Sequence, residues 1–278
     1  MIETELLRYL VEFSKSGSLS KAGEALHLSQ PSLSKAMQKL EQELGIDIFE
    51  RSKNKLVLNT NGLIILDYAK DILKIQESMF SFAKEVKEKN EEVLIGMCAP
   101  GPLFHYAGIL KGTSKFGKYV TEIIDDEEEL CKNLYNGKYD LVFLSEPIQK
   151  EGYFCQRMFK EHLYVSLPKE HFLSKSKESL TFEDIDGQTF LMDAKSGVWK
   201  DIIKKHLPKS RIIFQEDEES LMEMREHSSL LSFVTDLSQE SSTASNRINI
   251  PLSDEDATMS FYIMLKEHWT HCFKEFLK

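Results

Sequence analysis

The sequence lacks the features that mark secreted and membrane-spanning chains. No apolar run approaches the roughly 20 residues that a membrane helix needs. Residues 1–5 are acidic, whereas a signal peptide begins with basic residues before a continuous apolar stretch. The four cysteines, Cys98, Cys131, Cys155 and Cys272, are scattered and form no Cys-x-x-Cys pair. We therefore expect a cytoplasmic protein with reduced thiols and no membrane contact; a redox-sensing thiol is the alternative.

Motifs for catalysis and cofactor binding are also missing. The chain has no Gly-x-Ser-x-Gly, no P-loop, no Gly-x-Gly-x-x-Gly and no His-Glu-x-x-His. His268 and His271 lie beside Cys272 and supply half of a metal site, but no further ligand is evident. A terminal amphipathic helix with Trp269, Phe273 and Phe276 as packing residues is favoured instead. We expect no enzyme, no cofactor and no metal site.

Charge is distributed unevenly along the 278 residues. The composition, 41% hydrophobic and 29% charged, is that of a globular protein. Residues 1–58 hold eight basic and eight acidic side chains, and residues 59–89 hold five of each. Residues 90–278 hold 22 basic and 32 acidic side chains, so the whole net charge of −10 lies there. A neutral first part beside an acidic second part indicates two different roles.

The first 30 residues predict two short helices. Apolar residues recur at helical spacing in the first, at Leu6, Leu7, Leu10, Val11 and Phe13. Thr4 is its expected N-cap, and Gly17 is its expected end. Ser18 then starts a second helix, in which Gly23 allows close approach of a neighbouring segment.

A third helix is predicted between Ser29 and Gly45. Ser29 is its expected cap, and Pro31 falls in the first turn, where a missing N–H is tolerated. Its apolar residues are Leu33, Met37, Leu40 and Leu44. The opposite face contains donors suited to phosphates and base edges and no carboxylate. These residues are Gln30, Pro31, Ser34, Lys35, Gln38 and Lys39. Three helices with this turn predict a helix-turn-helix.

Two short strands should follow, at residues 48–51 and 56–58, with the polar turn 52–55 between them. Such a hairpin is a basic wing suited to the phosphate backbone. A single lysine on a helix is ordinarily only solvated. The combination of an apolar three-helix core, an acid-free face and a basic wing favours DNA binding.

Residues 5–70 resemble the winged helix-turn-helix of LysR-type transcriptional regulators. The resemblance is carried by Ser-Gly-Ser-Leu-Ser-Lys-Ala at 16–22, Ala-Leu-His-Leu-Ser-Gln-Pro-Ser-Leu-Ser at 25–34, Leu-Glu-Gln-Glu-Leu-Gly at 40–45 and Ile-Phe-Glu-Arg at 48–51. It implies that helix three contacts bases and phosphates and that Arg51 and Lys53 contact DNA from the wing. The candidate DNA-binding residues are Ser29, Gln30, Pro31, Ser32, Ser34, Lys35, Gln38, Lys39, Arg51 and Lys53.

A long helix is predicted from Thr60 to Val86, about 40 Å at 1.5 Å per residue. Its apolar and small residues form three rows of seven-residue spacing. The rows are Ile65, Ile72, Met79 and Val86; Gly62, Ala69, Gln76 and Ala83; and Leu66, Leu73 and Phe80. We interpret it as a linker that pairs two copies, because the family uses one here and small residues let helices approach. The alternative is one buried helix within a single domain.

The remaining chain alternates strand-like and helix-like segments, which predicts an α/β fold with parallel strands. Strands are expected at 93–97, 120–124, 141–144, 163–167, 212–214, 230–234 and 261–265. Helices are expected at 104–110, 128–135, 198–206 and 220–226. The expected organisation is a DNA-binding domain 1–59, a linker helix 60–89 and an effector domain 90–278.

The LysR resemblance, weaker here, implies two α/β lobes similar to periplasmic binding proteins, with the effector between them. The lobes would be 90–160 with 262–278, and 161–261. Four segments would supply residues of the effector pocket. They are the turn after the first strand and the end of the second strand in lobe one, and two turns in lobe two. The candidates are Cys98, Ala99, Pro100, Gly101, Asp125, Asp126, Asp193, Lys195, Ser196 and Ser228 or Ser229. The two aspartates of lobe one would suit a cationic effector, although a solvated acidic loop is the simpler interpretation.

The resulting hypothesis is a sequence-specific regulator that binds promoter DNA as a homodimer or homotetramer and responds to a small molecule. The alternative is a solute-binding or enzymatic α/β protein whose N-terminal helices serve only assembly. The acid-free face of helix three favours the regulator.

Overall fold

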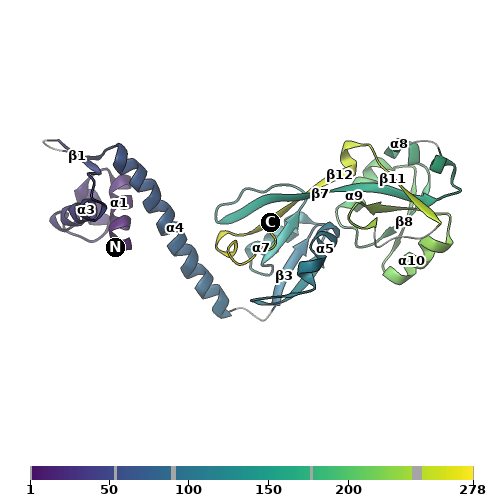
Figure 1. The fold of residues 1–278 in the computed structure, drawn as a ribbon, viewed down its shortest axis with the longest axis horizontal. Coiled ribbons are helices and arrows are strands. Elements are labelled where there is room, and N and C mark those ends of the chain that lie inside the picture. Colours follow the sequence, from purple (N-terminus) through teal and green to yellow (C-terminus); the bar gives the residue numbers. More distant parts are fainter. Residues whose placement is uncertain (1, 53–54, 89–91, 176–177, 240–245, 278) are drawn as a thin grey trace. The chain divides into compact units, whose positions relative to one another are not determined.

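The computed structural model describes residues 2–52, 55–88, 92–175, 178–239 and 246–277. The chain divides into two compact units, Met1–Lys87 and Glu88–Lys278 (Figure 1). Among the described residues, no helix is both long enough and apolar enough to cross a membrane.

The first unit consists of helices with one small hairpin. Its elements are α1 (Thr4–Ser16), α2 (Leu19–Ala25), α3 (Gln30–Leu44), β1 (Phe49–Ser52), β2 (Lys55–Leu58) and α4 (Thr60–Glu88). The predicted boundaries Gly17 and Gly45 are confirmed, since both end their helices with left-handed backbone. Ser18 and Ser29 cap α2 and α3 by accepting bonds from the backbone. The prediction for Thr4 was wrong: Glu3 occupies the N-cap position, without a side-chain bond.

The core of this unit lies where α1, α2 and α3 meet the hairpin. Leu10, Leu33, Leu40 and Ile48 are fully buried there. Gly23 lies against the turn before α3, because a Cβ there would be 2.7 Å from the Leu28 carbonyl oxygen. The absent side chain therefore sets the distance between α2 and the start of α3.

One side of α4 packs on this same core. A Cβ on Gly62 would collide with the Ile48 carbonyl oxygen, and Ala69 is only 1% exposed. Further along, Arg8 donates from Nη2 to Oε1 of Gln76 at 3.2 Å. The row containing Gly62, Ala69 and Gln76 thus faces its own N-terminal helices. The sequence predicts a stripe that packs on both the N-terminal domain and a partner helix, and within this unit the small residues take the first of these roles.

The second unit is a mixed α/β structure. Its helices are α5 (Gly101–His105), α6 (Ala107–Leu110), α7 (Glu127–Tyr135), α8 (Phe182–Ile185), α9 (Trp199–His206) and α10 (Glu218–His227). Its strands are β3 (Glu92–Met97), β4 (Thr113–Ser114), β5 (Gly117–Ile123), β6 (Leu141–Leu144), β7 (Tyr153–Pro168), β8 (Thr189–Asp193), β9 (Arg211–Gln215), β10 (Leu231–Thr235), β11 (Arg247–Pro251) and β12 (Thr258–Lys266).

Among the described residues the strand order is β4-β5-β3-β6-β12-β7-β10-β8-β9, with β11 also paired to β7. The two groups at either end contain the expected parallel pairs, β3 with β5 and β6, and β8 with β9 and β10. They are joined through β7 and β12, which pair antiparallel over nine positions, from Thr258↔His162 to Lys266↔Tyr153. The two groups of parallel strands are therefore connected by the long strands β7 and β12 (Figure 1).

The structure departs from the predicted elements in several places. The strand expected at 163–167 is only the end of β7, which is 16 residues long. The strands β4, β8 and β11 and the helix α8 were not predicted, and the helix expected at 104–110 is divided into α5 and α6. The C-terminal segment forms a short 3-10 turn, Glu267–Trp269, in place of the expected helix, although Trp269, Phe273 and Phe276 are buried as predicted. Aromatic packing of these three rings holds the segment without a regular helix.

Candidate functional sites

The outward face of α3 projects from the first unit. Gln30, Pro31, Lys35 and Gln38 are exposed, and Ser34 is half-buried. Leu33, Met37 and Leu40 anchor the opposite face in the core. At the start of the helix, Ser29 Oγ accepts from the Ser32 backbone N–H at 3.3 Å and lies 2.7 Å from Ser32 Oγ. Both hydroxyls thus order the first turn.

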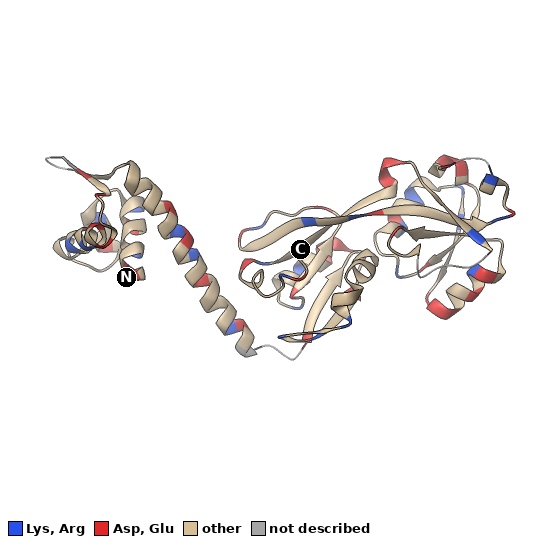
Figure 2. Cartoon of the chain, viewed as in Figure 1, with Lys and Arg blue, Asp and Glu red and all other residues tan. Residues whose placement is uncertain are grey.

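The two lysines of this face differ in their surroundings. Lys39 Nζ lies 2.7 Å from Glu3 Oε1 and 3.8 Å from Glu43 Oε1. The hydrogen bond to Glu3 raises the pKa of Lys39. Lys35 forms no ion pair within the described part of the chain, and it is exposed. The face is therefore not wholly free of acids, because Glu3 reaches Lys39 from outside α3. Figure 2 shows both basic residues, in blue, and acidic residues, in red, on the helices of this unit.

The hairpin is held to the end of α3 by a carboxylate. Glu41 Oε1 accepts from the backbone N–H groups of Ile48 and Phe49, at 3.0 and 3.1 Å. The helical spacing of Glu41 gives no signal of this bond, which depends on the chain turning back after Gly45.

The β1–β2 hairpin pairs antiparallel from Phe49↔Leu58 to Ser52↔Lys55. Its predicted DNA contact Lys53 lies outside the described residues. The backbone of Arg51 belongs to β1, and its side chain is likewise outside the described part.

A second row of apolar side chains on α4 is exposed in the first unit. Its spacings are four, four, three and four residues, typical of the seam of a coiled coil. The row comprises Ile64, Tyr68, Ile72, Ile75 and Met79, which are between 46% and 65% exposed.

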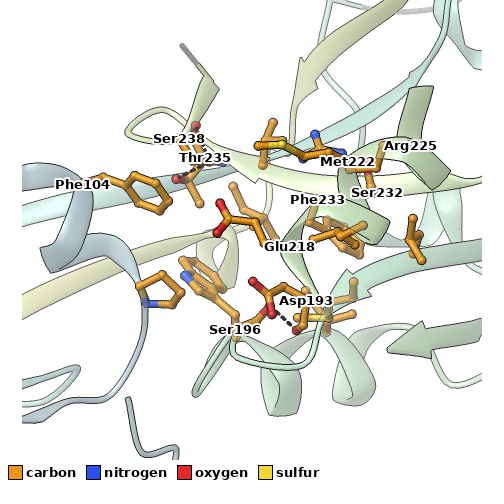
Figure 3. Close-up of a pocket in the computed structure, with 18 of the residues that line it drawn as sticks. Phe104, Asp193, Ser196, Glu218, Met222, Arg225, Ser232, Phe233, Thr235 and Ser238 are labelled. Carbon is orange, nitrogen blue, oxygen red and sulfur yellow. Dashed lines mark hydrogen bonds between the residues drawn. The ribbon is translucent and has the colours of Figure 1, made fainter. Parts of the chain in front are cut away.

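The second unit contains a cavity of about 160 Å³ between α5, α9, α10 and the strands β7, β8 and β10. Most of its lining is apolar, including Leu163, Leu191, Ile203 and Phe233. Figure 3 shows Arg225, Ser232 and Phe233 on one side of this pocket, with Phe104, Thr235 and Ser238 on the other.

The turn expected to contact the effector is largely covered by backbone. Cys98 and Ala99 are fully buried, and the Cys98 carbonyl accepts from the Val198 N–H at 2.9 Å. Gly197 lies so close that a Cβ there would collide with the Cys98 carbonyl oxygen. Pro100 lines the cavity, whereas a Cβ on Gly101 would lie 2.8 Å from Glu161 Oε2.

The two aspartates of the first lobe are engaged elsewhere. Asp125 Oδ2 forms an ion pair with Lys200 Nζ at 2.5 Å, and this bond lowers the pKa of Asp125. Asp126 Oδ1 caps α7 by accepting from Glu128 and Glu129 N–H. Neither lines the cavity, which removes the geometric basis for a cationic effector at these residues.

Some of the candidate residues of the second lobe line the cavity and others do not. Asp193 and Ser196 line it. Ser196 Oγ donates to the Asp193 carbonyl at 2.7 Å, and Asp193 Oδ1 accepts from the Lys195 N–H at 2.7 Å. Ser228 does not line it; its Oγ accepts from Leu230 N–H at 3.4 Å.

Six charged or hydroxyl-bearing residues of the cavity were not predicted from the sequence: Glu161, Glu218, Arg225, Ser232, Thr235 and Ser238. Glu161 is 1% exposed, its Oε2 accepts from Trp199 Nε1 at 3.0 Å, and burial raises its pKa. No sequence pattern marks it, because it precedes the strand expected at 163–167.

Two of the four thiols, those of Cys98 and Cys131, are buried. Burial raises the pKa of the Cys98 and Cys131 thiols, which disfavours the reactive thiolate. Within the described residues, no group of three His, Cys, Asp or Glu side chains is arranged to hold a metal ion.

Comparison with known proteins connects both units to one family. Residues 4–63 match the family described as bacterial regulatory helix-turn-helix protein, lysR family, and residues 122–271 match the LysR substrate binding domain. The regulator OxyR of Escherichia coli is 28% identical over 191 residues, 67% of this chain and 62% of that protein. The uncharacterised regulator YcgK of Bacillus subtilis is 28% identical over 175 residues, 61% of this chain and 53% of that protein.

These alignments span less than two thirds of either relative. Among solved structures, a full-length OxyR variant from Pseudomonas aeruginosa matches with a TM-score of 0.53 at 21% identity, covering 99% of this chain and 98% of that one. Full-length BenM matches with a TM-score of 0.51 at 21% identity, covering 99% and 95%. These likenesses support the expected fold class, a winged helix-turn-helix, a long helix and a two-lobed α/β domain. The chain belongs to the LysR family, a family of transcriptional regulators and not of enzymes.

Proposed function

We propose that this protein is a cytoplasmic LysR-type regulator that binds promoter DNA as a homo-oligomer and responds to a small molecule. The outward face of α3 is the observation that carries the proposal. We assign DNA binding to residues 1–59, pairing to 60–89 and effector binding to 90–278. The lobes are 90–160 with 262–278, and 161–261.

The chemistry of α3 suits the major groove of duplex DNA. The exposed amides of Gln30 and Gln38 can each pair with an adenine edge, and Lys35 can donate to guanine. The wing, with Arg51 and Lys53, supplies phosphate contacts. Because lysine and arginine displace counterions from phosphates, the affinity should fall steeply with salt.

The exposed row on α4 supports pairing of two copies. Tyr68, Ile72, Ile75 and Met79 follow heptad spacing, and Ile64 lies one turn before them. Their burial against an identical helix would remove a continuous apolar strip from water. Two paired copies present two α3 helices, so the operator should contain two half-sites at helical-turn spacing.

The cavity supports control by a small molecule. It touches α5 of one lobe and α9 and α10 of the other, so a ligand there contacts both lobes. A ligand that binds one lobe arrangement more tightly than another shifts the population toward it, and so changes how DNA is held.

The test is fluorescence anisotropy of the full-length protein with duplexes from its own promoter region, compared with a shuffled duplex across a salt series. Saturable preference for the promoter sequence with a steep salt slope is expected. Equal affinity for both duplexes at every salt concentration would overturn the proposal.

A further inference from the structure

Two guanidinium groups of the second lobe, that of half-buried Arg225 and that of buried Arg247, form no ion pair with a carboxylate among the described residues. Arg247, 8% exposed, donates to Ser166 Oγ and to the carbonyl oxygens of Ser166, Leu230 and Arg225 at 2.7–3.2 Å. All of these acceptors are neutral. The Arg225 carbonyl accepts from Arg247 Nη1 at 2.9 Å, so the two residues are in contact. Burial, followed by the charge of Arg225, lowers the pKa of Arg247.

Arg225 is the less satisfied of the two. Its Nη2 is buried without a hydrogen-bond partner among the described residues. The same holds for the hydroxyl of Ser232, a residue only 1% exposed. Both residues line the cavity. Two buried donors that lack acceptors, one of them cationic, form a subsite that an anionic ligand would complete.

Strand pairing places Ser232 close to the guanidinium group of Arg247. Ser232 lies opposite Ser166 on β7, and the Ser166 hydroxyl accepts from Arg247 Nε. The other polar end of the cavity is three residues along β10, at Thr235, about 10 Å away. There Glu161 already accepts from Trp199 Nε1. Figure 3 shows Ser232 and Thr235 on opposite sides of the pocket.

Acidic side chains do not neutralise the Arg225 end. Asp193 Oδ1 is engaged by the Lys195 N–H, and Glu218 is exposed in the first turn of α10. Seven residues separate Glu218 from Arg225, about 10 Å along the helix axis. The anion-binding end is therefore distinct from the acidic opening.

The size of the cavity limits the ligand. A cavity of about 150 Å³ lined by apolar side chains holds one benzene molecule, and this one measures about 160 Å³. Leu163, Leu191 and Phe233 line it with other apolar residues. An apolar body of about one ring therefore fills the available space.

We propose that this cavity selects a small monocarboxylate with a compact apolar body, whose carboxylate accepts hydrogen bonds from Arg225 Nη2 and Ser232 Oγ. The inference rests on the proposed function, because it names the chemical class of the effector.

The experiment is calorimetric titration of the full-length protein with matched probes of one skeleton and different charge. The probes are benzoate, benzamide and benzylamine, and 3-methylbutanoate with 3-methylbutanamide. At least one acid should bind about tenfold more tightly than its amide, because a charge-assisted hydrogen bond is lost in the amide. No acid binding at millimolar concentration, no preference over the amide, or a preference for benzylamine would overturn the inference.

Variants then locate the anion. Arg225→Gln should abolish the preference for acid over amide, and Ser232→Ala should weaken acid binding about threefold. The matched control Arg211→Gln changes an exposed arginine of β9 outside the cavity and should leave both affinities unchanged. Retention of the acid preference in Arg225→Gln would contradict the assignment. Should that variant fail to fold, Ser232→Ala and the wild-type comparison still decide.

Promoter anisotropy on the same samples separates the two proposals. Specific DNA binding without any acid preference overturns only the ligand class. Absence of specific DNA binding overturns the regulator, whatever the cavity binds.

Discussion

Gly197 lies directly against the carbonyl oxygen of Cys98, with a backbone φ of +62°. Together with the Val198 N–H bond to the same carbonyl, this contact joins the first turn of lobe one to the segment before α9 in lobe two. Cys98 and Ala99, two of the residues expected to contact the effector, are thus covered by the protein's own backbone, whereas Pro100 of the same turn lines the cavity.

We predict that Gly197→Ala destabilises the protein by about 2–4 kcal/mol. Left-handed backbone disfavours alanine by about 1–2 kcal/mol, and the new Cβ must also displace backbone atoms of Cys98 and Ala99. Urea unfolding measures the change. The control Gly137→Ala has a similar φ of +78° but open space around its Cβ, so it isolates the backbone contribution. Equal losses in both variants would contradict a steric contact between the lobes.

The unequal surroundings of the two α3 lysines predict unequal effects on DNA binding. Lys35→Ala and Ser34→Ala should each weaken specific promoter binding by about 1–3 kcal/mol if these residues contact bases. Lys39→Ala should have a smaller effect, because Glu3 and Glu43 already offset its charge. Anisotropy titrations measure all three, with Lys15→Ala, distant on α1, as the control.

A complementary change tests the same ion pair. Glu3→Gln removes the carboxylate that holds Lys39 Nζ at 2.7 Å, so it should strengthen DNA binding and steepen its salt dependence. Unchanged affinity and slope would show that Lys39 does not reach the DNA.

Pairing through α4 predicts that Ile75→Glu separates the oligomer. Ile75 is 65% exposed within the unit, so a glutamate there stays in water in a single copy. In an interface between two α4 helices the same carboxylate would be buried, which is costly. Sedimentation velocity measures the change in mass. Ser81→Glu, an exposed position off the apolar row, should leave the oligomer intact. Persistence of the oligomer in Ile75→Glu would exclude this row as its interface.

Glu161 predicts a pH dependence of stability. Burial raises its pKa above the ordinary 4.5, so the folded protein holds this proton more tightly than the unfolded chain. The corresponding stability is fully present below pH 4.5 and is lost as pH rises through the raised pKa. Glu161→Gln cannot titrate, so the difference in free energy of unfolding between variant and wild type should grow across that interval. Urea titrations at several pH values measure the free energy of unfolding of both proteins. If the difference between them does not change with pH, the prediction is refuted.

Local chemistry explains what the sequence could predict. Gly17, Ser29 and Gly45 act on backbone groups within a few residues, so their patterns predicted α1 and α3 almost to the boundary. The cavity depends on distant partners: Ser232 meets Ser166 only through pairing of β10 with β7. No periodicity in the sequence signals that contact.

The long helix shows the same limit. The heptad rows of α4 predicted an amphipathic helix correctly, but the row containing Gly62 and Ala69 proved to face the N-terminal core. Spacing shows which residues share a face, whereas the partner of that face depends on how the chain turns back after the hairpin.

The carboxylate of Glu41 has a consequence for how the first unit meets a duplex. By holding Ile48 and Phe49 N–H groups, it makes the end of α3 and the base of the hairpin one rigid body. A shift of α3 along the groove by one base pair therefore carries the hairpin with it. In the proposed DNA complex, the spacing between the α3 contacts and the hairpin contacts would therefore be set within the protein, which reduces the ordering entropy lost on binding.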